Sequence, residues 1–146
     1  IHSGRLPPGF KINLYDHGGR HGRGVAYATP FFEHLLNVPA SGMSALPDDP
    51  GHFMAWLAHH HDAGVDPPGF YPRRVYGDYL RSFLDDAVDA ARAAGIDLTL
   101  ITAPGPDHAP DDTTIQVRAT GVAAPRWPGG VRPQDDFVLD TPYGPA

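Results

Sequence analysis

Glycine and proline divide this chain into short pieces, and this constrains its fold more than any other feature of the sequence. The 146 residues include 17 glycines and 17 prolines, nearly twice the usual combined share of roughly 12%. Neither residue favours the interior of a helix or a strand, so their clusters mark turns and loops. Because 41% of the residues are hydrophobic, we expect one loop-rich folded domain rather than a disordered chain.

Two stretches between these clusters are long enough to predict helices of several turns. In residues 75–94, apolar side chains recur every three or four positions and so share one face of a helix; they are Tyr76, Tyr79, Leu80, Phe83, Leu84, Ala87, Val88 and Ala91. Gly95 is the expected stop. A second helix is predicted from about Pro50 to Gly64, with Phe53, Trp56, Leu57 and His60 on one face.

Short segments with alternating polar and apolar residues predict strands at 11–15, 96–101 and 114–121. The order strand, long loop, helix, helix, strand, strand favours an α/β fold, with a small parallel sheet and helices on its face. We expect the apolar face of the later helix to pack on that sheet, with Leu84 in the core. The segment 25–50 is predicted to be irregular and packed on the core, with one helical turn near 32–36.

The whole chain, residues 1–146, is expected to be one incomplete domain. We divide it into a lead-in at 1–10, a core at 11–101 and a loop-rich tail at 102–146. The sequence starts at Ile1 and three strands are few for a doubly wound domain, so we expect a fragment of a larger protein.

Composition excludes several classes of function. With no cysteine, disulfides, zinc–thiolate sites and thiol catalysis are excluded. A formal net charge of −6 argues against a nucleic-acid partner, which would need clustered Lys and Arg. No run approaches the roughly 18–20 apolar residues of a membrane span. The chain has no signal-peptide pattern, and we expect a cytoplasmic location.

Three familiar kinds of site are also disfavoured. His59, His60 and His61 are consecutive, and consecutive helical side chains diverge by about 100°, so we expect no metal site there. The serine-hydrolase pattern Gly-x-Ser-x-Gly is absent. The four Asp-Asp pairs lie in predicted loops or on a polar helix face, where solvated charge is the better interpretation.

The loop at 16–24, with the sequence DHGGRHGRG, admits two interpretations. It is a phosphate-binding loop or a flexible loop at the exit of a strand, and the absence of a helix directly after it favours the second. Asp16 likewise is a turn former or an acid that binds the ribose hydroxyls of a dinucleotide, since a carboxylate can accept from two vicinal hydroxyl groups.

Longer motifs resemble the FAD/NAD(P)-binding domain family of flavoprotein oxidoreductases. The family pattern G-x-G-x-A-Y-x-T matches GRGVAYAT at 22–29, and H-L-L-N-V-P-A-x-x-M-S matches HLLNVPASGMS at 34–44. P-x-x-F-x-x-W-L and P-R-x-x-Y-G-x-Y-L follow at 50–57 and 72–80. The resemblance covers residues 9–95. A more distant one, in P-x-R-x-x-x-x-Y-L, is to flavin-dependent N-hydroxylating monooxygenases.

The resemblance implies a partial Rossmann-like FAD-binding fold and a set of cofactor-binding residues. Residues 11–16 correspond to the second strand of the FAD unit, with Asp16 on the adenosine ribose, and 117–121 to a strand on the far side of the cofactor. Arg73 and Tyr76 open a helix that closes over the site. The other implied cofactor-binding residues are Gly22, Arg23 and Gly24 in the loop beside the cofactor, and His34, Leu36, Asn37, Val38 and Met43 near the flavin.

The implied function is the FAD-binding portion of a flavin-dependent oxidoreductase, monooxygenase-like, with NAD(P)H as electron donor. The family's first strand and its Gly-x-Gly-x-x-Gly turn should precede residue 11, and the ten residues present do not supply them. We therefore expect this chain alone to bind FAD weakly or not at all and to be inactive. The alternative is a non-catalytic binding or interaction domain derived from the same fold. The substrate is not indicated.

Overall fold

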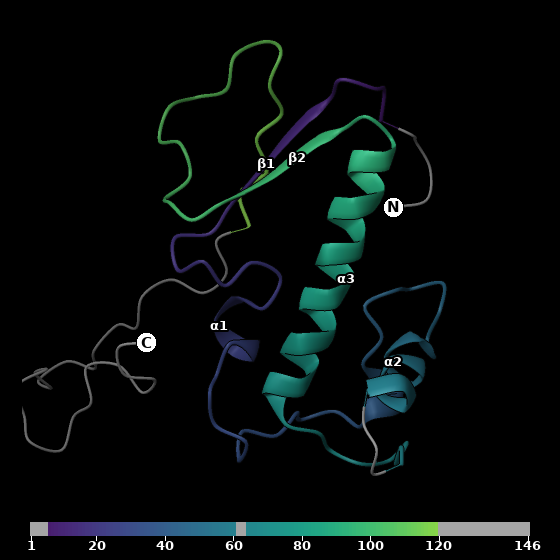
Figure 1. The fold of residues 1–146 in the computed structure, drawn as a ribbon. Coiled ribbons are helices and arrows are strands. Elements are labelled where there is room, and N and C mark those ends of the chain that lie inside the picture. Colours follow the sequence, from purple (N-terminus) through teal and green to yellow (C-terminus); the bar gives the residue numbers. More distant parts are fainter. Residues whose placement is uncertain (1–5, 61–63, 120–146) are drawn as a thin grey trace, which may run out of the picture. The chain divides into compact units, whose positions relative to one another are not determined.

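The computed structural model describes residues 6–60 and 64–119. By contact density the chain divides into two compact units, residues 1–105 and 106–146. The first holds, in chain order, β1 (Lys11–Tyr15), α1 (Gly24–Tyr27), the 3₁₀ turn η1 (Ala40–Gly42), α2 (His52–His60), α3 (Arg73–Ala93) and β2 (Asp97–Ile101) (Figure 1). This is a small α/β arrangement, consistent with a partial Rossmann-like fold. The organisation as one domain stays a prediction.

The two strands form the parallel sheet that the sequence predicted. Their register pairs Lys11 with Asp97 at one end and Tyr15 with Ile101 at the other. Parallel strands need a long crossover, and here it contains α2 and α3. Because the strands run the same way, Tyr15 and Ile101 bring both carboxyl ends to one edge of the sheet.

Helix α3 begins two residues earlier than predicted. Pro72 directly precedes it, and a proline there costs no helical hydrogen bond because its missing N–H would have had no partner in the helix. At the other end Gly95 has a φ of 71° and stops the helix as predicted, since this conformation is natural for glycine. Within the described part of the chain, no helix has the length and apolar character needed to cross a membrane.

The hydrophobic core lies between α2 and the first half of α3, not at the sheet. Phe53 and Leu57 of α2 and Tyr79 of α3 are completely buried. Leu36 and Ala40, from the segment before α2, complete this cluster together with Val75 and Tyr76. The expectation that the apolar face of α3 packs on the sheet is therefore wrong for the first half of the helix. Only the second half of α3 lies beside β2 (Figure 1), and Leu84 is half-buried.

The segment 25–50 is irregular, as predicted, but its helical turns lie elsewhere. No helix forms at 32–36; the chain is helical at Gly24–Tyr27 and Ala40–Gly42 instead. The reason is that this stretch pairs with the chain leading into α3. The Leu36 N–H donates to the Tyr71 carbonyl, and the Arg73 N–H donates to the His34 carbonyl, at 2.8 and 2.7 Å. These long-range bonds occupy backbone groups that a local turn would use.

The predicted strand at 114–121 is wrong for the residues that the structure describes. Residues 114–119 have no strand, and residues 120–121 lie outside the described part. Ile115 and Val117 remain 85% and 84% exposed, so the alternating apolar side chains are not buried against any partner. Gln116 donates instead to the Pro106 carbonyl of the same unit, at 3.2 Å.

Candidate functional site

Asp16 lies at the carboxyl end of β1, where the backbone fixes it to β2. Its N–H donates to the Ile101 carbonyl at 3.0 Å. Its Oδ1 accepts a hydrogen bond from the Gly18 N–H at 2.8 Å, which closes a turn. Among the described residues nothing donates to Oδ2, and the side chain is only half-buried. One carboxylate oxygen therefore shapes the loop, and the other is available to a ligand.

The loop that follows β1 contacts both strands and α3. His21 is 5% exposed, and its Nε2 lies 3.2 Å from the carbonyl oxygens of both Leu14 and Ile101. Gly22 has a φ of 82°, and a Cβ there would lie 3.2 Å from the Leu80 carbonyl oxygen of α3. Glycine permits both this backbone conformation and this close approach.

Arg23 connects the loop to α3 while leaving one donor unused. Its Nη2 lies 2.8 Å from Oδ1 of Asp78, and both side chains are partly exposed. Its Nε is buried and has no hydrogen-bond partner among the described residues. A buried donor without an acceptor is costly, and it is the exposed part of this guanidinium that a ligand can reach.

The expectation that no helix directly follows the loop 16–24, here called the glycine loop, is wrong. Gly24, with a φ of 58°, is the first residue of α1. This helix is a single turn of four residues, so its aligned peptide dipoles are few and it does not by itself form an anion site. Tyr27 at its end packs against α3, where its ring contacts that of Tyr76 with centroids 4.8 Å apart.

The remaining predicted residues lie around the start of α3. His34 Nδ1 is hydrogen-bonded to Thr29 Oγ1 at 2.8 Å, and Arg73 Nε donates to the Leu35 carbonyl at 3.0 Å. Leu36 and Met43 pack in or against the core. The exposed positions of this group are Asn37 and Val38. The ten predicted residues therefore form a group at the end of β1 and a group beside α3, and their cofactor contacts stay predictions.

Tyr76, which the resemblance placed at the entry to α3, is buried rather than open to a ligand. It is 7% exposed, and its ring also contacts Phe53 at a centroid distance of 5.0 Å. Burial, with smaller contributions from Tyr27 and Tyr79, raises the pKa of Tyr76 to about 12. Its contacts in the structure are those of a core residue.

Sequence reasoning missed His21 as a structural residue. In the loop, His17 and His21 look equivalent, and no helical or strand periodicity distinguishes them. Only the fold shows that His21 is buried and His17 exposed. The one available signal was the glycine density around it, because tightly turned loops bring side chains back onto the elements they connect.

The histidine run at the end of α2 has its described rings bonded to their own helix. Nδ1 of His59 and Nδ1 of His60 donate to the carbonyls of Ala55 and Trp56, one turn earlier, at 2.7 and 2.8 Å. His61 lies outside the described residues. In the described ranges, no group of three His, Asp or Glu side chains is arranged to hold a metal ion.

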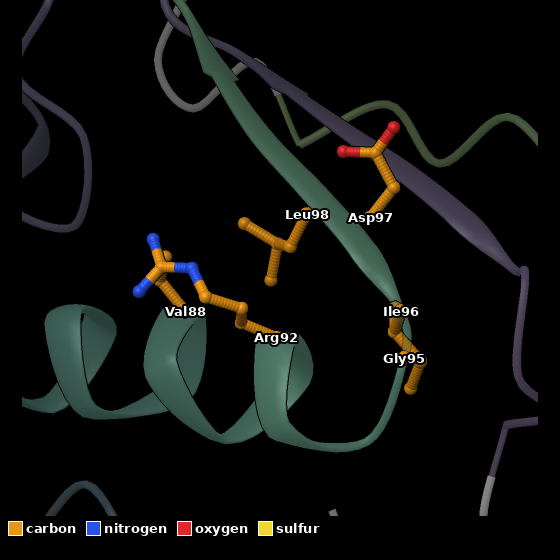
Figure 2. Close-up of a pocket in the computed structure, with 6 residues that line it drawn as sticks. All are labelled: Val88, Arg92, Gly95, Ile96, Asp97 and Leu98. Carbon is orange, nitrogen blue, oxygen red and sulfur yellow. The ribbon is translucent and has the colours of Figure 1, made fainter.

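An open pocket of about 380 Å³ lies where α3 leads into β2, at the amino end of the sheet. Figure 2 shows that Leu98 points toward α3 and Asp97 points away from it. The pocket is lined by Val88, Arg92, Gly95, Ile96, Asp97 and Leu98. None of the predicted site residues lines it, and Asp16 lies at the opposite end of the strands.

Comparison with protein-family models matches residues 3–123 to a family described as FAD-NAD(P)-binding. No curated protein and no solved structure matches the chain. The matched range includes β1, β2, the loop 16–24 and helices α1, α2 and α3.

Proposed function

The chain belongs to the FAD-NAD(P)-binding family, and on this premise we propose that it is the FAD-binding portion of a flavin-dependent oxidoreductase that takes electrons from NAD(P)H. Asp16 at the carboxyl end of β1 is the observation that carries this proposal. Ligands of open α/β sheets bind outside the carboxyl ends of the strands, and an acid there binds the adenosine ribose.

The groups present at this end of the sheet fit a dinucleotide. Asp16 Oδ2 can accept hydrogen bonds from vicinal ribose hydroxyls, because Oδ1 alone is used by the Gly18 N–H. The partly exposed guanidinium of Arg23 suits an anionic acceptor such as a phosphate oxygen. Bound FAD would supply the redox chemistry, whereas the protein would hold it and exclude water.

The monooxygenase-like character is the finer part of this proposal, and the P-x-R-x-x-x-x-Y-L motif supports it. In this chain the motif runs from Pro72 to Leu80 and opens α3. Its tyrosine, Tyr79, is completely buried, where its hydroxyl lies 2.7 Å from His52 Nδ1. The motif therefore holds the helix against α2. The competing possibility is a non-catalytic binding domain.

Amide chemical shifts during titration with FAD test the nucleotide site, since they detect even weak binding. We expect FAD to shift the amide signals of Gly18 and Gly19. Asp16→Asn should raise the Kd about tenfold, which corresponds to about 1.4 kcal/mol. This variant keeps an acceptor for the Gly18 N–H but loses the charge and the acceptor at Oδ2. Asp86→Asn, the same change at an exposed site on α3, is the matched control.

Two results would contradict the proposal. The nucleotide site is wrong if FAD shifts no signals in the loop, or if Asp16→Asn binds FAD like the unchanged protein. The monooxygenase-like character is tested in a longer protein in which an upstream strand and Gly-x-Gly-x-x-Gly turn are joined to the chain, because the chain alone is expected to be inactive. FAD binding by that protein without oxygen-dependent oxidation of NADPH would favour the non-catalytic binding domain.

A further inference from the structure

We propose that His21 is a positioning residue for this nucleotide site: its buried ring joins the glycine loop to the ends of both strands and so holds the Asp16 carboxylate in place. The inference rests on the proposed function for the identity of the ligand. The role of the His21 ring in the loop does not depend on the proposed function, because it follows from the hydrogen bonds of the ring.

The geometry defines which nitrogen of the ring carries a proton. Nε2 faces two carbonyl oxygens, those of Leu14 and Ile101, each at 3.2 Å. Carbonyl oxygens only accept hydrogen bonds, so Nε2 must carry the hydrogen and share it between them. With 5% of the residue exposed, water has little access to replace this donor. The ring is therefore a fixed bridge across the ends of the two strands.

The bridge reaches Asp16 through one shared acceptor. The Ile101 carbonyl accepts from His21 Nε2 and also from the Asp16 N–H, at 3.2 and 3.0 Å. The turn after Asp16 is then closed by the N–H groups of Gly18 and Gly19, which donate to Asp16 Oδ1 and to its carbonyl. Asp16, at the start of this turn, and His21, just after it, are thus both bonded to the Ile101 carbonyl of β2.

A loop of this composition needs such an anchor. It contains Gly18, Gly19, Gly22 and Gly24, and glycine loses more conformational freedom on ordering than any other residue. A freely moving loop would let the carboxylate sample many orientations. Nucleotide binding would then be weakened by the conformational entropy lost when the loop becomes ordered. With the ring in place, the carboxylate is ordered before the ligand arrives.

Three variants test this in the full chain. His21→Leu removes the donor at similar size. His21→Gln places an amide Nε2 near the position of the ring Nε2, within reach of the same carbonyls. His17→Leu, an exposed histidine of the same loop, is the matched control. Should His21→Leu fail to fold, His21→Asn takes its place, because its shorter amide does not reach both oxygens.

Amide hydrogen exchange in the ligand-free protein is the first readout. We expect His21→Leu to speed exchange at Gly18 and Gly19 about tenfold while leaving α3 unchanged, and both His21→Gln and His17→Leu to stay within threefold of the parent. Unchanged exchange at the two glycines overturns the inference. So does an equal rise throughout α3, which would mean that the ring only supports overall stability.

Titration with FAD is the second readout. We expect His21→Leu to raise the Kd about tenfold in the parent but less than threefold when combined with Asp16→Asn, because the ring acts through the carboxylate. Equal effects in both backgrounds overturn the inference. If the parent protein shows no response to FAD, the proposed function fails, and the exchange result alone decides whether His21 holds the loop.

Discussion

Tyr76 and Tyr79 lie one turn apart on α3, and their hydroxyl groups meet different surroundings. The Tyr79 hydroxyl accepts from the Ala45 N–H at 3.1 Å and is hydrogen-bonded to His52 Nδ1 at 2.7 Å. The Tyr76 hydroxyl makes no hydrogen bond in the part of the chain that the structure describes, and its ring is packed among aromatic side chains. Burial therefore contributes most to the raised pKa of Tyr76, with smaller contributions from Tyr27 and Tyr79.

The raised pKa of Tyr76, about 12 against an ordinary value of 10.0, predicts a loss of stability at high pH. In the unfolded chain this tyrosine ionises near its ordinary pKa, whereas in the folded protein it stays protonated until about pH 12. Its contribution is thus complete below pH 10 and declines as the pH rises toward 12. Denaturant unfolding of Tyr76→Phe should show a shallower decline across this range. Parallel curves for the two proteins would contradict the assignment.

At the scale of elements, the close contact of α1 with α3 depends on one glycine. Gly77 is buried on α3, and a Cβ added there would overlap the carbonyl oxygen of Tyr27 at the end of α1. The same contact brings the Tyr27 ring against Tyr76. Since α1 directly follows the glycine loop, the packing of α1 against α3 also fixes the carboxyl end of that loop.

Gly77→Ala should destabilise the protein although alanine is the better helix former. Helix propensity favours the change by about 0.5–1 kcal/mol, but overlap with a backbone oxygen forces α1 to move and costs about 1–3 kcal/mol. We expect a lower midpoint of thermal unfolding and shifted amide signals for residues 24–27. A higher midpoint would mean that α1 does not pack closely on α3.

At the scale of the whole described molecule, the core and the candidate site occupy different places. The core is built from α2, the first half of α3 and the segment before α2. Within residues 6–60 and 64–119 the sheet has two strands, and Leu14 and Tyr15 of β1 are 40% and 38% exposed. Stability therefore comes mainly from the helices, whereas the proposed ligand chemistry lies at the carboxyl edge of the sheet.

Two leucine-to-alanine variants distinguish these regions. Leu57→Ala, at a completely buried position, should cost about 2–5 kcal/mol of unfolding free energy because it leaves a cavity in the core. Leu84→Ala removes the same atoms at a half-buried position and should cost less than half as much. Denaturant unfolding measures both. Equal costs would place Leu84 in the core, as its helical spacing alone had predicted.

The sequence by itself determined the elements and the family. Glycine and proline set most of the element boundaries, hydrophobic spacing predicted both long helices, and alternation predicted β1 and β2; each of these depends on residues that are near neighbours along the chain. The motifs at 22–29, 34–44 and 72–80 identified the family through residue types and spacing. Asp16 at the end of β1 followed from the same local pattern.

Only the tertiary structure decided how these pieces meet. The bond between His21 and Ile101 joins residues 80 positions apart, and no local pattern distinguishes that ring from the exposed His17. The helical stripe of α3 predicted a buried face, but whether α2 or the sheet covers it depends on chain packing. Alternation predicted a strand at 114–121, yet a strand forms only where a partner supplies hydrogen bonds and burial, and residues 114–119 have neither.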